Sequence, residues 1–268
     1  MGTHIHPSAI VDADAGLGES VQIGPYCVVG PDVQVGDGTR LVAHVTLQGP
    51  TRLGRRCRVF PYAAIGTAPQ DRSYADEPTL LEIGDDNTLR EQVTLHRGTV
   101  KGGGVTRLGS RCLLMVGAHV AHDCHLADDV VLTNSTALGG HVTVESGVVC
   151  GGQVAVAPFV RLGRGCFVAG GAKVERDVPP FVIAAGDRAR VRGLNRVGIE
   201  RMGFSETSRQ ALQRAFRLLW RSGAPLAHSV AALRSEPDLD AQVAYLLDFI
   251  EARLSTTAGG RGLISAGH

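Results

Sequence analysis

Four histidines fall within a short stretch of the sequence, residues 114–142, whereas most of the chain carries none. They are His119, His122, His125 and His141. Histidine is the side chain that most readily binds metal ions and moves protons near neutral pH. Which of the four can act together depends on where the surrounding chain places them.

The stretch belongs to a repeat with a period of six residues. An aliphatic residue recurs at every sixth position from Ile5 to Ile65, at Ile83, Leu89 and Leu95, and again from Leu108 to Val174. A small or branched residue commonly follows four places later, and we count 26 such hexapeptides. A period of six excludes an amphipathic helix, whose period is 3.6, and a hairpin sheet, whose period is two.

The hexapeptide pattern predicts a parallel β-helix. Each hexapeptide would supply one flat face and one corner, and three would close a triangular coil of 18 residues. Stacked coils would bury the first and fifth side chains of each hexapeptide. With strands about 4.8 Å apart, about nine coils would form a prism on the order of 40 Å long. The 35 Gly and single Trp suit such small, repeated layers.

Composition and charge bear on the compartment and the binding partners of the protein. All six cysteines occupy inward positions of the repeat, so we expect buried, reduced thiols rather than disulfides. No apolar run approaches the roughly 20 residues that span a bilayer, and no signal peptide is recognisable, so we expect a cytoplasmic protein. The net charge of +1 gives no reason to expect nucleic acid binding. Residues 179–268 hold 12 Arg against 8 acidic residues, which suits an acidic partner or simply a solvated helical surface.

Two interruptions break the repeat, at residues 66–81 and 100–106. Neither fits a regular prism wall, so we expect both to project from corners as loops. Loops held on a rigid scaffold often carry function. A tolerated surface insertion is the alternative for each.

The repeat stops at the pair Pro179-Pro180. We therefore predict a β-helix over residues 1–178 and a small helical domain, capping the prism, over residues 179–268. Helices are expected over 205–223, 225–234 and 239–254, followed by a loose tail over 256–268.

The repeat also positions the histidines. His122 and His141 belong to hexapeptides that begin one coil apart, so we expect them one above the other at the same corner, outside the core. They are then close enough to share a ligand, although a chance pair of exposed histidines would have the same spacing.

A metal site is a competing interpretation of this cluster. His119 and His125 occupy the same position in successive hexapeptides, so they should lie on successive faces and point apart. Cys124 should point inward. Within one chain the geometry therefore argues against a metal site. A site shared between subunits, as in the hexapeptide-repeat carbonic anhydrases, stays open.

Motifs along nearly the whole chain point to a family. They run from IHPSAIV through QD..YA.EPT, LR..VTLHRGTV.GGG.T, LLM..AHVAHDC, N..AL.GHV and DVPPFVIA.G to RGLI near the end. These motifs resemble those of the UDP-N-acetylglucosamine 3-O-acyltransferases of lipid A biosynthesis. Many acyltransferases share a hexapeptide repeat, but HRGT followed by GGG and AHVAHDC is specific to this family and its close relatives.

The resemblance implies a fold and an activity. The fold is an all-β solenoid plus α: a left-handed parallel β-helix with a C-terminal helical domain, assembled as a homotrimer with active sites between subunits. The left hand is an exception to the usual right-handed crossover. The activity is transfer of a (3-hydroxy)acyl chain from acyl carrier protein to the 3-hydroxyl of UDP-N-acetylglucosamine, the first step of lipid A biosynthesis. No metal, other cofactor or covalent intermediate is implied.

The resemblance also implies roles for individual residues. His122 matches the general base, and Asp123 matches the carboxylate that orients and charges it. Gly140 matches the backbone N–H donor that stabilises the thioester oxygen, an effect worth about 3 kcal/mol. The residues that match substrate-binding positions are Gln70, Asp71, His119, His141, Gly152, Asn195 and Arg201, the last two acting from the next subunit, and those that match the acyl-length region are Gly170 and Arg188.

The sequence departs from the family pattern at the nucleotide end. The family's lysine in the first loop is Ser73 here, its His-Gln pair before Phe159 is Ala157-Pro158, its glutamate near the uracil is Val197, and its length-setting histidine is Arg188. Two alternatives follow. One is a paralogue that acylates another UDP-sugar or an amino sugar. The other is a trimeric binding or scaffold protein without turnover, which would have no need of the intact catalytic set.

Overall fold

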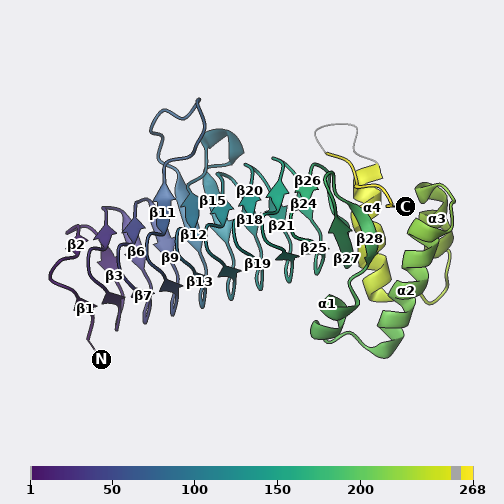
Figure 1. Ribbon diagram of the computed structural model, residues 1–268, viewed down its shortest axis with the longest axis horizontal. Coiled ribbons are helices and arrows are strands. Elements are labelled where there is room, and N and C mark those ends of the chain that lie inside the picture. The colour runs from purple at the N-terminus through teal and green to yellow at the C-terminus, as the bar shows by residue number, and fades with distance from the viewer. Residues whose placement is uncertain (1, 255–260, 268) are drawn as a thin grey trace.

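The computed structural model describes residues 2–254 and 261–267 and shows a triangular prism of short strands with helices at one end (Figure 1). Three sheets form the prism, named here faces A, B and C. The chain visits them in turn, so partners along a face lie 18 residues apart wherever the repeat is uninterrupted, as in the pairing of His119 with Ala137. The predicted coil of three hexapeptides is confirmed.

Within each face the neighbouring strands of the prism are parallel, and among the described residues the one antiparallel pair is the last, β27 (Val182–Ala185) with β28 (Arg190–Leu194). Face A holds β1 (His4–Ile5), β4 (Gln22–Ile23), β7 (Arg40–Leu41), β10 (Arg58–Val59), β13 (Thr88–Leu89), β16 (Leu113–Leu114), β19 (Val131–Leu132), β22 (Val149–Cys150), β25 (Phe167–Val168), β27 (Val182–Ala185) and β28 (Arg190–Leu194). Face B holds β2 (Ile10–Val11), β5 (Val28–Val29), β8 (Thr46–Leu47), β11 (Ala64–Thr67), β14 (Thr94–His96), β17 (His119–Val120), β20 (Ala137–Leu138), β23 (Ala155–Val156) and β26 (Lys173–Val174). Face C holds β3 (Gly16–Leu17), β6 (Val33–Val35), β9 (Thr51–Leu53), β12 (Leu80–Ile83), β15 (Val105–Leu108), β18 (His125–Leu126), β21 (Thr143–Val144) and β24 (Arg161–Leu162).

The core is a set of apolar ladders that run the length of the prism. The first and fifth residues of the hexapeptides point inward, and from the second coil onward nearly all of them are buried. Each buried Val or Leu stabilises the fold by about 1.5–3 kcal/mol relative to an exposed one. All six cysteines are buried and free, which confirms the expectation of reduced thiols that act as small apolar residues.

The corners explain much of the glycine content. Many corner residues adopt the left-handed backbone conformation, as Tyr26 does with φ of 57°, and glycine reaches this conformation without steric cost. Other glycines are required because successive coils are close. A Cβ on Gly24 would lie 1.8 Å from the Val42 carbonyl oxygen of the next coil.

Both interruptions of the repeat form loops at one corner of the prism. Residues 68–79 leave face B after β11, and residues 97–104 leave it after β14 and contain the short 3₁₀ helix η1 (Val100–Gly102). Each loop rejoins the prism on face C, so both project from the corner between faces B and C, named here the B–C corner. Figure 1 shows them side by side above the prism. The expectation that the interruptions project from a corner is confirmed.

Beyond β26 the chain first extends face A and then becomes helical. β27 adds to β25, β28 pairs with β27, and the helices follow. The three expected helices are present, and α1 was not expected. Among the described residues, no helix has the length and apolar character needed to cross a membrane. The helices are α1 (Arg196–Arg201), α2 (Glu206–Arg221), α3 (Leu226–Arg234) and α4 (Ala241–Leu254).

The expectation of a loose tail is wrong for residues 261–267. The Ile264 N–H donates to the Asp177 carbonyl oxygen at 3.0 Å, and the Asp177 N–H donates to the Gly262 carbonyl oxygen at 2.8 Å. The Ile264 side chain is buried. The apolar pair Leu263-Ile264 thus ties this segment to the end of the prism. The rest of the expected tail, residues 256–260 and 268, lies outside the described residues.

Candidate active site

His122 and Asp123 form a hydrogen-bonded pair at the B–C corner, between β17 and β18. The His122 Nδ1 lies 2.8 Å from the Asp123 Oδ2. The Asp123 side chain is buried, and that of His122 is 15% exposed. An ionised carboxylate can only accept, so Nδ1 carries the proton that it donates to Asp123. The Nε2 of His122 then keeps its lone pair and is free to take up a proton.

The carboxylate of Asp123 is held by the second loop. The Thr99 N–H donates to Oδ1 at 2.8 Å, and the Thr99 hydroxyl donates to Oδ2 at 2.7 Å. The Asp123 N–H in turn donates to the Thr106 hydroxyl at 2.7 Å. A Cβ on Gly102 would lie 2.0 Å from the Asp123 Cγ, so only glycine fits there. The loop residues 97–104 therefore fix the orientation of this carboxylate.

Gly140 lies directly above His122 in the next coil. A Cβ on Gly140 would lie 2.6 Å from the His122 Cε1, so any other residue would displace the imidazole ring. The Gly140 carbonyl oxygen accepts from the Phe159 N–H at 3.0 Å. Among the residues described, the Gly140 N–H donates to no protein group. This donor is therefore available beside the imidazole.

His141 completes a ladder of rings at this corner. Its Nε2 lies 3.6 Å from the Asp123 Oδ2. Its ring meets that of His122 edge to face, with centroids 5.2 Å apart, and stacks on Phe159 at 4.4 Å. The predicted closeness of His122 and His141 is confirmed. Partial burial lowers the pKa of His141, so its ring is neutral at pH 7.

The first loop contributes Asp71 and Gln70 near the same corner. The Asp71 Oδ1 accepts from the Ser73 N–H at 2.8 Å and from the Ser73 hydroxyl at 2.9 Å. These hydrogen bonds lower the pKa of Asp71, and the charge of the Lys101 ammonium lowers it further. Asp71 is therefore an anion within electrostatic range of the imidazole. Gln70 is exposed.

Arg97 joins the first loop to the second. Its Nη1 donates to the Gly66 carbonyl oxygen at 2.7 Å, and its Nη2 donates to the Tyr74 hydroxyl at 3.0 Å. Lys101 makes a further link, because its Nζ donates to the Ser73 Oγ at 3.0 Å. The two loops form one unit over the B–C corner.

His119 and His96 lie beside this corner on face B. The His119 Nδ1 is 2.8 Å from the Thr94 Oγ1, and the two histidine rings meet edge to face at 5.2 Å. The His96 Nδ1 donates to the Ala68 carbonyl oxygen at 2.8 Å, and this bond fixes the tautomer. Burial lowers the pKa of both histidines. Both rings are therefore neutral at pH 7.

The metal interpretation can be compared with this geometry. His119 on face B and His125 on face C point apart, and Cys124 is buried, as the repeat predicts. The structure instead brings His122, Asp123 and His141 together, with ligand atoms within 4.8 Å of one another. Both Asp123 oxygens already accept hydrogen bonds from Thr99 and His122. The donor set thus fits a hydrogen-bonded base better than an ion.

Asn195 and Arg201 lie elsewhere in the chain, beside face A. With Val197 they line a cavity of about 680 Å³ that also touches Phe167. The Asn195 Oδ1 accepts from the Gly198 N–H at 3.0 Å and so caps α1. Val197 is 58% exposed. The cavity therefore offers a guanidinium and a largely apolar wall to a ligand.

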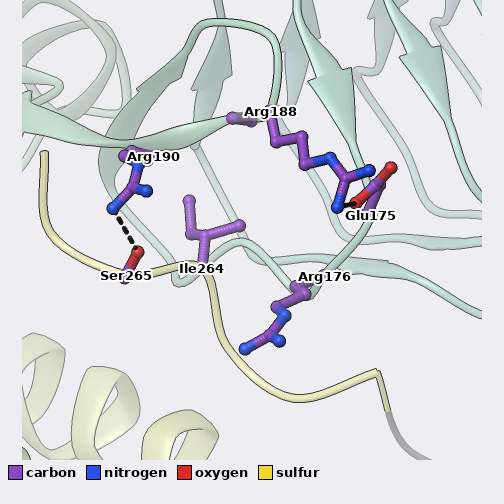
Figure 2. Close-up of a pocket in the computed structure, with 7 residues that line it drawn as sticks. Glu175, Arg176, Arg188, Arg190, Ile264 and Ser265 are labelled. Atoms are coloured by element: carbon purple, nitrogen blue, oxygen red, sulfur yellow. Dashed lines mark hydrogen bonds and ion pairs between the residues drawn. The ribbon is translucent and has the colours of Figure 1, made fainter.

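Gly152 and Gly170 lie at another corner of the prism, between faces A and B, named here the A–B corner. They occupy successive coils, and a Cβ on Gly170 would lie 3.2 Å from the Gly152 carbonyl oxygen. Arg188 lies next to β26, the last strand of face B, where it pairs with Glu175 at 3.3 Å. Both residues line a cavity of about 250 Å³. Figure 2 shows the pair there, with Arg190 pointing toward Ser265.

The candidate residues thus occupy different sides of one prism. His122, Asp123 and Gly140 share the B–C corner with the two loops, Gly152 and Gly170 lie at the A–B corner, and Asn195 and Arg201 lie beside face A. One chain does not bring these groups into a single pocket. Sequence reasoning missed Thr99, Gly102 and Thr106, although they lie in the motif HRGTVKGGGVT. A surface insertion without contacts is excluded for this second loop.

Two family models match the chain. Residues 177–264 match domain 2 of the UDP-N-acetylglucosamine O-acyltransferases, and residues 14–49 match the six-repeat bacterial transferase hexapeptide.

Relatives match over nearly the whole length. The chain is 42% identical over 248 residues to the acyl-(acyl-carrier-protein)–UDP-N-acetylglucosamine O-acyltransferase of Thermodesulfovibrio yellowstonii, covering 92% of this chain and 96% of that protein. It is 43% identical over 256 residues to the enzyme of the same name from Herminiimonas arsenicoxydans, covering 96% and 98%.

Solved structures also match nearly the whole length of the chain. The crystal structure of the UDP-N-acetylglucosamine O-acyltransferase of Moraxella catarrhalis superposes with a TM-score of 0.90 at 40% identity, covering 97% of this chain and 99% of that one. The acyltransferase of Campylobacter jejuni gives 0.90 at 36% identity, covering 98% and 100%. The expected fold class, a left-handed parallel β-helix with C-terminal helices, is confirmed.

Proposed function

Because this chain belongs to the family of the acyl-(acyl-carrier-protein)–UDP-N-acetylglucosamine O-acyltransferases, we propose that His122 is the general base of its acyl transfer. The protein is an acyltransferase. Its acceptor is the 3-hydroxyl of UDP-N-acetylglucosamine and its donor is a (3-hydroxy)acyl thioester of acyl carrier protein, in the first step of lipid A biosynthesis. The observation that carries the role of His122 is its hydrogen bond to buried Asp123, which leaves Nε2 as a proton acceptor.

The reaction needs a base because a sugar hydroxyl is a poor nucleophile. The His122 Nε2 takes the hydroxyl proton as the sugar oxygen forms its bond to the thioester carbonyl carbon. Negative charge develops on the carbonyl oxygen, and the Gly140 N–H stabilises it. The intermediate then collapses, the carbon–sulfur bond breaks, and the departing thiolate takes the proton from His122. The imidazole ends neutral, as it began.

Asp123 acts through His122 rather than on the substrate. Its carboxylate holds the ring in the Nδ1–H tautomer and stabilises the imidazolium that forms while the proton is on Nε2. Burial strengthens this effect because the local dielectric is low. Thr99 keeps both carboxylate oxygens bonded, so the ring has a single favoured orientation.

The active enzyme is a homotrimer with its sites between subunits. This assembly is supported by the separation of the candidate groups, since no single chain joins the B–C corner to Arg201 and Gly170. A neighbouring prism would supply them. Light scattering that shows an active monomer would contradict the proposed homotrimer.

The two parts of the chain divide the work. Residues 1–178 perform the transfer, and residues 179–268 hold the nucleotide through Asn195 and Arg201, whose planar guanidinium suits phosphate oxygens. Gln70, Asp71, His119 and His141 contact the acceptor and donor around His122, Gly152 contacts substrate from the A–B corner, and Gly170 with Arg188 limits acyl length. The enzyme works in the cytoplasm, where its carrier-protein donor is found.

One assay tests the function. Purified enzyme is offered a mixture of acyl carrier protein thioesters together with UDP-N-acetylglucosamine and several other UDP-sugars, and products are identified by mass spectrometry. The expected product is UDP-N-acetylglucosamine that carries one ester-linked acyl chain. An amide product, or acylation of another sugar alone, would assign the protein to a different acceptor. Absence of any product would support the scaffold alternative.

A further inference from the structure

The structure places a lysine ammonium where the first loop lacks one. The resemblance puts a lysine at position 73, and this chain has Ser73. Lys101 reaches across from the second loop, and its Nζ donates to the Ser73 Oγ at 3.0 Å. The positive charge that is absent from position 73 in the sequence is therefore present beside it in space.

Lys101 is close to the groups that the mechanism uses. It lies in η1, two residues after Thr99, which binds the Asp123 carboxylate. Ser73, which it contacts, donates both its N–H and its hydroxyl to Asp71. Lys101, Ser73 and Asp71 therefore form one chain of hydrogen-bonded contacts between the two loops.

The Lys101 ammonium also has N–H groups that are available to a ligand. An ammonium has three N–H groups, and among the described residues Ser73 is the group that accepts from Lys101. Lys101 is exposed, so a ligand can reach it. The sequence has only one other lysine, Lys173, among 27 basic residues, and Lys173 pairs with Asp187 at 2.6 Å. Within residues 2–254 and 261–267, Lys101 is thus the lysine that makes no ion pair with a carboxylate.

We propose that Lys101 is a substrate-binding residue that replaces the first-loop lysine and binds a phosphate oxygen of a substrate. An ammonium recognises phosphate as a compact point charge and needs no fixed approach angle, so a residue from a different loop can serve. Two phosphate-containing groups are available in the proposed reaction, the diphosphate of the acceptor and the phosphodiester of the carrier protein's prosthetic arm. The inference rests on the proposed function.

Chemical labelling tests the contact without relying on turnover. The protein is acetylated slowly with N-hydroxysuccinimidyl acetate, and the labelling rates of Lys101 and Lys173 are followed by mass spectrometry. Lys173 is an internal reference on the same chain. Saturating UDP-N-acetylglucosamine or acyl carrier protein thioester should slow labelling of Lys101 several-fold relative to Lys173, and the protecting substrate identifies which phosphate is bound. Equal labelling ratios with both substrates and with neither would overturn the proposal.

Kinetics of three variants test the replacement itself. Lys101→Ala should raise the KM of one substrate about tenfold, the loss expected for one charge-assisted contact, with kcat little changed. Lys101→Arg should retain most affinity because it keeps the charge. The double variant Ser73→Lys with Lys101→Ala should recover the lost affinity, since it returns an ammonium to the same place from the other loop.

The outcomes separate this inference from the proposed function. If the wild-type enzyme makes no acyl-UDP-sugar, the proposed function fails first. If the wild type turns over but Lys101→Ala has unchanged KM for both substrates, only the role of Lys101 fails. A fall in melting temperature in Lys101→Ala without a KM change would show a purely structural link between the loops, and the double variant would then give no recovery.

Discussion

The Thr99 hydroxyl donates to the Asp123 Oδ2 across 2.7 Å, although the two residues lie on different coils and 24 positions apart. A loop that interrupts the repeat therefore orients the Asp123 carboxylate, and that carboxylate in turn orients His122, the proposed base. Gly98 and Gly102 are part of the same device, because a Cβ on either would lie within 2.9 Å of an Asp123 carboxylate atom. The geometry of the proposed catalytic pair therefore depends on a segment outside the regular scaffold.

Thr99→Val should lower kcat by about tenfold, because one hydrogen bond to a buried charged group is lost. The pH dependence of kcat should also change, since Asp123 would stabilise the imidazolium less well in its altered position. Thr99→Ser is the matched control and should retain the profile. A fall in melting temperature with an unchanged pH profile would show that Thr99 serves only folding.

His122→Ala should lower turnover by on the order of 10² to 10⁴ while the fold stays intact, because the side chain lies at a corner and not in the core. His125→Ala is the matched control, since His125 is a neighbouring face C residue outside the hydrogen-bonded pair. A chelator should leave the wild-type rate unchanged. If chelator abolished activity and zinc restored it, a metal site between subunits would replace the general base.

Gly140→Ala should lower kcat by about 100-fold or more, because the new Cβ would push the imidazole from its place and small displacements of catalytic groups cost this much. Gly193→Ala is the control, since a Cβ there meets nothing within 4 Å. Circular dichroism should show both variants folded. Full activity of Gly140→Ala would contradict the close approach to His122.

UDP-N-acetylglucosamine should bind more weakly here than to a typical family member. Ala157, Pro158 and Val197 each replace a residue that the resemblance makes longer, charged or hydrogen-bonding, and one lost polar contact costs about 0.5–3 kcal/mol. Changing Ala157 to His together with Pro158 to Gln should lower the acceptor KM. A wild-type KM at the family norm, or no gain in the double variant, would show that these positions do not limit affinity.

The six cysteines should stay unreactive until the protein unfolds. Burial raises the pKa of Cys112 to about 11 and that of Cys124 to about 12, so at neutral pH the nucleophilic thiolate is almost absent. A strong reductant should leave the melting temperature unchanged. Titration with a coloured thiol reagent should give no thiols in the native protein and six in denaturant. Rapid reaction of any native thiol would contradict the inward placement.

The repeat made the scaffold predictable, because a strict period of six fixes which face and corner each residue occupies. The closeness of His122 and His141 followed from one coil of spacing alone. The second-loop contacts could not be read in this way, since Thr99 lies outside the periodic register and its partner is chosen by the fold of the loop. The packing of the segment around Ile264 was missed for a similar reason. This segment is not part of the repeat, so the period does not show that Ile264 pairs with Asp177 on the last coil of the prism.

The regular coil also constrains how such an enzyme can change over time. Insertion of a single residue into a strand of the prism would move the side chains that follow it in that strand from the core to the solvent side. Insertion of a whole coil would leave the inward and outward positions unchanged. The separation between the catalytic corner and the helical end can therefore vary only in steps of one strand spacing, about 4.8 Å. Smaller changes in substrate selectivity must come from substituted side chains and from the two loops, whose lengths can change by single residues.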